Sequence, residues 1–210
     1  MKSICKLNLL LFLCIHITLS VNSQEKGRAI KYGFVYGIGE QGIFPFSDDD
    51  YLYETKSYKA QLNYVFKEVN KFSFEINVEP SVFISKHQLL NKHFITPDYG
   101  SDYLEERDRQ TAKKTMKEYS LGIGVISRYN FTENMSAYAL GSVGPMIIDT
   151  RTERMAKGFS FSDIFSFGFS YKIEKIILDL RYGVRHVSNF QLKNPNSGYN
   201  STNFEIGFFS

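Results

Sequence analysis

The feature that most constrains this chain is a two-residue alternation of apolar and polar side chains. Eight stretches show it: 29–39, 58–67, 72–79, 119–128, 135–148, 159–172, 176–188 and 203–208. In 72–79, for example, the apolar set alternates with a polar one, Phe72, Phe74, Ile76 and Val78 against Ser73, Glu75, Asn77 and Glu79. Successive residues of a strand point to opposite faces, so the pattern predicts eight strands, each with one apolar face. It is weakest in 135–148, where Gly141, Gly144 and Pro145 interrupt it.

The connections between these stretches alternate in length. Short ones fall at 68–71, 130–134 and 172–175, and long polar ones at about 40–57, 85–115, 149–158 and 189–200. An even number of strands with short turns at one end and long loops at the other is typical of outer-membrane barrels. We therefore predict an all-β fold, an eight-stranded antiparallel up-and-down transmembrane β-barrel with both termini periplasmic. A barrel of this size is filled by side chains, which argues against a channel.

The first residues favour export. Lys2 and Lys6 precede a mostly apolar run from Leu9 to Leu19, and Val21, Asn22 and Ser23 follow, with small residues at the positions that a signal peptidase recognises. This pattern predicts a cleavable signal peptide over residues 1–23 and a barrel domain over 24–210. No later stretch approaches the roughly 20 consecutive apolar residues of a membrane helix. The chain is therefore expected in the outer membrane as a multi-pass barrel.

Composition excludes several classes of function. Both cysteines, Cys5 and Cys14, lie in the predicted signal, so the mature chain is expected to have neither a disulfide nor a cysteine nucleophile. Removing Lys2 and Lys6 lowers the 25 basic side chains to 23, against 22 acidic ones, a balance that gives no reason to expect nucleic acid as a partner. We expect no cofactor and no metal, because one acidic triplet, 48–50, is a weak signal for calcium.

A soluble barrel of the lipocalin kind is the alternative fold, since alternation alone does not say which face lies inside. The polar face carries charged residues that suit either a soluble exterior or a paired, side-chain-filled lumen: Glu75, Glu79, Glu118, Arg128, Asp179, Arg181, Arg185 and Glu205. The asymmetry of the connections and the alternating aromatic residues at the C-terminus favour the membrane barrel.

The densest cluster of chemically capable residues is the segment 185–200, RHVSNFQLKNPNSGYN, where the seventh predicted strand leads into the eighth. It resembles the lipid A 3-O-deacylase family, the acyloxyacyl hydrolase-like outer-membrane barrels. The residues that carry this resemblance keep the family's spacing: His186, Ser188, Asn189, Lys193, Pro195, Asn196 and Gly198. The expected eight strands agree with the family's fold.

The resemblance implies an esterase that removes a 3-hydroxyacyl chain from lipid A, part of the lipopolysaccharide of the outer leaflet. It implies Ser188 as the nucleophile and His186 as the base. The family has a Glu where this chain has Asn200, and Asn can still fix the tautomer of a histidine. The expected oxyanion donors are Asn189, Asn196 and backbone N–H groups of the 189–191 turn, in which Gln191 replaces a family Gly.

The alternation places these side chains independently of the family. His186 and Ser188 are in phase with the apolar residues of their strand, so both are expected on the lipid-facing side. Asn200 is in phase with Phe204 and is expected there too, whereas Glu205 has the opposite phase and is rejected as a substitute carboxylate. A strand needs about 9–11 residues to cross the hydrocarbon, so His186 is expected near the outer surface.

One polar residue breaks the apolar face of 159–172. This residue is Asp163, in a face otherwise made of Phe and Tyr.

Two alternatives to an esterase stay open. One is a non-catalytic small barrel with a structural or surface-interaction role, in which Asn200 marks a lost activity. The other is the soluble lipid-binding barrel.

Overall fold

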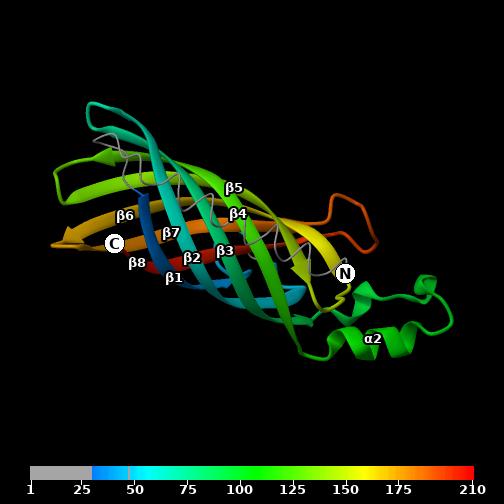
Figure 1. Cartoon of the computed structure of the whole chain (residues 1–210). Coiled ribbons are helices and arrows are strands. Elements are labelled where there is room, and N and C mark those ends of the chain that lie inside the picture. Colours follow the sequence, from blue (N-terminus) through cyan, green and yellow to red (C-terminus); the bar gives the residue numbers. More distant parts are fainter. Residues whose placement is uncertain (1–29, 47) are drawn as a thin grey trace, which may run out of the picture.

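The computed structural model describes residues 30–46 and 48–210, so the predicted signal peptide, 1–23, lies outside the described residues. Eight strands form one closed barrel in which every neighbouring pair is antiparallel and β1 pairs with β8 (Figure 1). Their bounds are β1 Ile30–Glu40, β2 Tyr51–Val69, β3 Phe72–Leu89, β4 Lys114–Asn130, β5 Met135–Ile148, β6 Gly158–Ile173, β7 Ile176–Ser188 and β8 Tyr199–Phe209. The predicted fold class is confirmed.

The two ends of the barrel differ as the connections predict. Short turns join β2 to β3, β4 to β5 and β6 to β7 at one end, where Ser210 also pairs with Tyr32. The longer connections and α2 (Tyr103–Thr111) lie at the other end (Figure 1). In outer-membrane barrels the short turns are periplasmic, so the loop end is extracellular. None of the helices among the described residues is long and apolar enough to cross a membrane.

Two loops are shorter than expected because β2 and β3 continue beyond the apolar band. Their register extends to Tyr51 opposite Leu89, and their outward residues in this extension include Glu54, Lys56 and Lys86. Loss of the apolar outward pattern therefore marks the edge of the membrane rather than the end of the strands. The connection from β3 to β4 also contains two 3-10 turns, Lys92–Phe94 and Pro97–Tyr99, besides α2.

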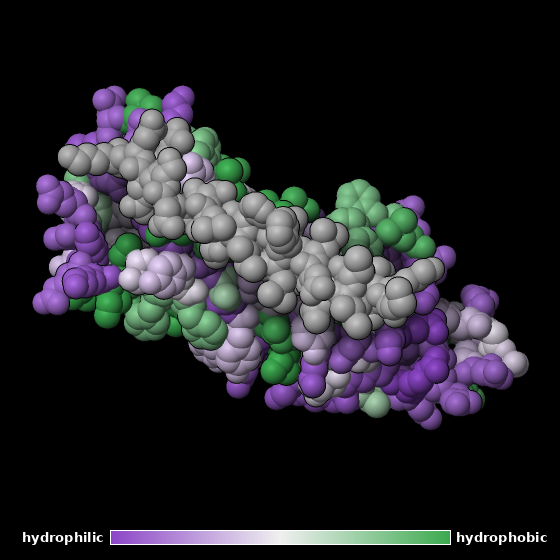
Figure 2. Space-filling view, in the orientation of Figure 1, coloured by the Kyte–Doolittle hydropathy of each residue, from purple (hydrophilic) through white to green (hydrophobic). Residues whose placement is uncertain are grey.

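The outer wall of the barrel is apolar. Its exposed side chains include Tyr58, Leu62, Ile76, Leu121, Ile123, Val143, Phe165, Phe167, Leu180 and Phe204. Figure 2 shows hydrophobic residues along the wall and hydrophilic residues gathered at both ends. This band is what a lipid bilayer requires of a barrel surface.

The lumen is polar and filled by ion pairs. Arg128 contacts Glu75 at 2.6 Å, and Arg185 contacts Glu118 at 2.6 Å. A second group joins Lys59 to Glu79 and Glu205, each at 2.8 Å, and Arg181 to the same two carboxylates. The charged residues of the alternating pattern are thus buried inside and neutralise one another, which corrects any placement of them on a soluble exterior.

Candidate active site on the outer wall

His186 and Asn200 meet on the outer wall at the loop end of β7 and β8. They are directly opposite each other in the β7–β8 register. The ring nitrogen Nδ1 of His186 lies 2.7 Å from the side-chain oxygen Oδ1 of Asn200. An amide oxygen only accepts hydrogen bonds, so Nδ1 carries the hydrogen. The second ring nitrogen, Nε2, therefore keeps its lone pair and is available as a proton acceptor.

Gly198 gives this ring its space. Its φ of 69° lies in the left-handed region, and a Cβ there would stand 2.6 Å from the carbonyl oxygen of Val187 and 3.4 Å from Cε1 of His186. Any other residue would be strained in its backbone and would clash with the carbonyl oxygen of Val187, next to the imidazole. Glycine at this position therefore lets the loop pass close to the ring.

Ser188 is the last residue of β7, and it is half-buried on the same face as His186. Same-face neighbours on a regular strand are about 6.6 Å apart. Among the hydrogen bonds of the described residues, none joins Ser188 to His186. Catalytic hydrogen bonds commonly shorten only when substrate is bound, so this spacing is compatible with a nucleophile and its base.

A tight turn follows Ser188. The N–H of Leu192 donates to the carbonyl of Asn189 at 3.0 Å, and the two central residues, Phe190 and Gln191, have φ values of 54° and 60°. Left-handed backbone costs a residue with a Cβ roughly 1–2 kcal/mol. A Gly would adopt this conformation without strain, whereas Gln191 adopts it at a cost.

The structure gives Asn189 another role than the expected oxyanion donor. Its side chain is buried, and Nδ2 donates to the carbonyl of Lys193 at 2.6 Å. Its backbone N–H donates to Oδ1 of Asn196 at 2.7 Å. Asn189 therefore holds the loop together. The hydrogen bonds of the described residues leave free the N–H groups of Phe190 and Gln191 and the Nδ2 group of Asn196.

Two residues that sequence reasoning missed support this loop and β8. Nε of Arg154 donates to the carbonyl of Gly198 at 2.7 Å, from the connection between β5 and β6. The side-chain oxygen of Gln41 accepts from the N–H of Asn200 at 3.0 Å, from the connection between β1 and β2. Both side chains come from parts of the chain far from the motif, so no local spacing could indicate them.

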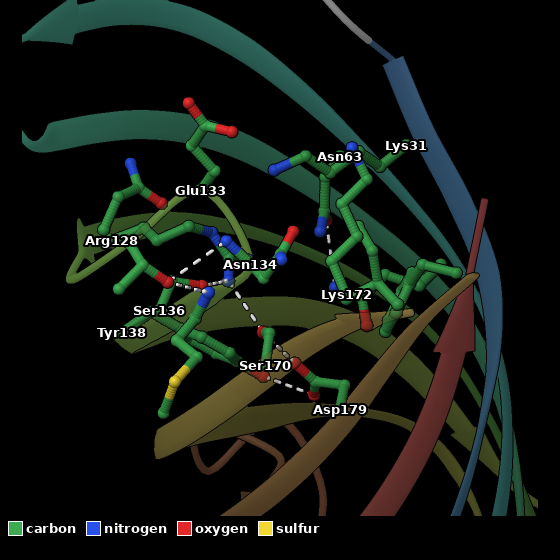
Figure 3. Close-up of a pocket in the computed structure, with 16 residues that line it drawn as sticks. Lys31, Asn63, Arg128, Glu133, Asn134, Ser136, Tyr138, Ser170, Lys172 and Asp179 are labelled. Atoms are coloured by element: carbon green, nitrogen blue, oxygen red, sulfur yellow. Dashed lines mark hydrogen bonds between the residues drawn. The ribbon is translucent and has the colours of Figure 1, made fainter. Parts of the chain in front are cut away.

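A polar hollow of about 210 Å³ opens at the opposite, turn end of the lumen (Figure 3). Its central side chains are already paired, because Arg128 donates to Ser136 and Ser170, and Ser170 donates to Asp179 at 2.6 Å.

The described residues contain no cluster of three or more His, Cys, Asp or Glu that could hold a metal ion. Glu205 lies in the lumen and cannot reach His186.

Comparison with known proteins identifies the family and the fold. The family model for lipid A 3-O-deacylase (PagL) matches residues 89–209. The crystal structure of the outer membrane enzyme PagL aligns with a TM-score of 0.52 at 11% identity, over 85% of this chain and 98% of that one. Neisserial surface protein A aligns with a TM-score of 0.47 at 13% identity, over 88% of this chain and 98% of that one. No match was found among curated protein sequences.

Fold and outer wall together define an integral β-barrel protein of the outer membrane. The family model covers more than half of the chain, residues 89–209, and includes the whole 185–200 motif. The chain belongs to the lipid A 3-O-deacylase (PagL) family. The resemblance drawn from the motif is thereby confirmed.

Proposed function

We propose that this protein hydrolyses an acyl ester of lipid A in the outer leaflet, with Ser188 as the nucleophile and His186 as the base. The observation that carries the proposal is the 2.7 Å contact between His186 and Asn200 on the lipid-facing wall at the loop end. At the height of the lipid headgroups, an oriented imidazole beside a serine can act on a glucosamine-linked ester while the lipid stays in the membrane. Family membership supports lipid A as the substrate.

The reaction follows from these groups. Nε2 of His186 accepts the proton of Ser188 as Oγ attacks the ester carbonyl carbon, and the developing oxyanion is stabilised by the N–H groups of Phe190 and Gln191 and by Nδ2 of Asn196. The intermediate collapses when the C–O bond to the sugar breaks and the sugar oxygen takes the proton from His186. Water, deprotonated by His186, then attacks the acyl-serine and releases the fatty acid and free Ser188.

Mass spectrometry of lipid A from cells that produce the protein tests the proposal. The expected result is loss of one hydroxyacyl chain with the wild-type protein, and intact lipid A with Ser188→Ala or His186→Ala. Both residues stand at the rim and pack little of the barrel, so both variants should still fold.

Ser127→Ala and His93→Ala are matched controls, because both residues are exposed and lie elsewhere on the molecule. They should act like wild type. Unmodified lipid A with folded wild-type protein would overturn the proposal and favour the non-catalytic barrel, in which Asn200 reflects a lost activity.

A further inference from the structure

Asp163 is a carboxylate on the lipid-facing wall. It lies in β6, whose other outward residues are aromatic: Phe159, Phe161, Phe165, Phe167, Phe169 and Tyr171. Its side chain is half-buried, and it forms no hydrogen bond or ion pair with any other described residue. A carboxylate costs little free energy near the headgroups, but in the described barrel no cation or hydrogen-bond donor pairs with this one. This residue therefore needs an explanation outside the fold.

The strand register supplies one. Asp163 is directly opposite His186 in the β6–β7 pair, and His186 is directly opposite Asn200 in the β7–β8 pair. The three outward side chains form one row across three strands, along the direction of the interstrand hydrogen bonds. Directly opposed residues have Cβ atoms about 4.5–5.5 Å apart. Asp163 thus flanks His186 on the side away from Asn200.

Asn200 and Asp163 together provide what a single carboxylate provides in a catalytic triad. Asn200 fixes the tautomer through Nδ1, but its amide is neutral and cannot offset the positive charge that the ring gains in the reaction. Asp163 carries a negative charge beside the ring but lies on its other flank. We propose that Asp163 is a positioning residue that stabilises the His186 imidazolium through its electric field, in place of the carboxylate that Asn200 replaces.

This inference rests on the proposed esterase activity. The charged residue directly opposite His186 in the strand register is Asp163 of β6, while Arg154, which faces Asp48 at 3.9 Å, reaches the carbonyl of Gly198 from an adjoining loop and β8 presents the neutral Asn200. The Arg154 cation opposes an imidazolium, and Asp163 is the carboxylate on the neighbouring strand that favours it. Opposite charges about 6 Å apart at an effective dielectric constant of about 20–40 attract strongly enough to change the rate of a step that creates one of them roughly ten- to a hundredfold.

The test is the Asp163→Asn variant, assayed for ester hydrolysis across pH in detergent or lipid. Without the anion, the imidazolium is less stable, so kcat should fall about tenfold or more while KM changes little. For the same reason the acid limb of the rate–pH profile should lie at lower pH in the variant than in wild type. A merely structural role would not move this limb.

Rescue and control variants complete the design. Asn200→Glu restores a carboxylate next to the ring, so the double variant Asp163→Asn with Asn200→Glu should recover most of the lost rate. Asp163→Glu keeps the charge and should retain activity. Glu54→Gln is the matched control, because Glu54 is an outward carboxylate on β2, three strands away from β7, and its loss should leave the rate unchanged.

Each contrary outcome is distinguishable. If wild type is active, Ser188→Ala is inactive and Asp163→Asn equals wild type, the inference fails and the proposed function stands. If wild type itself is inactive, the proposed function fails. A fall in rate only with hydroxyacyl esters, and none with a hydroxyl-free p-nitrophenyl ester, would show that Asp163 contacts substrate instead. Failure of Asp163→Asn to fold would also overturn the inference, because it assigns Asp163 no structural role.

Discussion

Asn200→Ala removes the acceptor that orients His186, the proposed base. In the structure this acceptor is a single amide oxygen 2.7 Å from Nδ1 of His186. A hydrogen bond from a neutral donor contributes about 0.5–1.5 kcal/mol, and one from a charged donor about 1.5–3 kcal/mol. The ring is neutral before proton transfer and charged in the transition state, so the bond strengthens by about 1–1.5 kcal/mol as the reaction proceeds. Its removal should therefore lower kcat about five- to tenfold.

The assay is steady-state hydrolysis of a lipid ester by the purified barrel, with kcat and KM measured separately. KM should stay within about twofold, because Asn200 acts mainly on the transition state. Asn134→Ala, in an exposed turn at the opposite end of the barrel, is the matched control. An Asn200→Ala enzyme with wild-type kcat would remove Asn200 from the site and refute the reasoning.

Asn200→Glu makes the complementary change. A carboxylate at this position accepts the same hydrogen bond and adds an attraction for the imidazolium, so activity should be kept or raised. The gain should grow with pH, because only the ionised Glu provides that attraction. A rate that falls as pH rises would contradict this prediction.

Three further predictions concern the fold and the loop. The folded barrel should fractionate with outer membranes and migrate faster on gels before heating than after, whereas a soluble periplasmic protein would contradict the membrane assignment. Gln191→Gly should raise the stability of the 189–192 turn by roughly 1 kcal/mol, since it relieves a left-handed φ of 60°, and slower proteolysis of the loop would show it. Glu118→Gln leaves the buried Arg185 without its counter-ion and should destabilise the barrel by about 3–5 kcal/mol in urea titration.

The strands were predictable wherever one face is uniformly apolar. The bounds of 176–188 agree with β7 because Leu180 and Tyr182 face lipid while Asp179 and Arg181 face the lumen. In β5 the alternation is blurred for a steric reason: a Cβ at Gly144 would stand 2.3 Å from the carbonyl oxygen of Leu121. The sequence shows that residue 144 is a glycine, but it does not show that the carbonyl oxygen of Leu121 leaves no room for a side chain there.

The parts of the site that follow from the alternation were predictable from the sequence. The parts that depend on loop conformation were not. Phase alone places His186 and Asn200 on one face, and the structure pairs them. The role of Asn189 was not predictable, because it depends on how the loop folds back to bring the Lys193 carbonyl to its side chain. Arg154 and Gln41 were missed because they approach from separate loops.

The contact between His186 and Asn200 joins two strands, so it exists only after β7 and β8 have paired. Asp163 reaches the same row only when β6 is in register with β7. A newly made chain on its way across the cell envelope carries the serine and the histidine but not their arrangement. Folding in the outer membrane is therefore the step that switches on the proposed activity, and lipids in the membranes crossed earlier are spared.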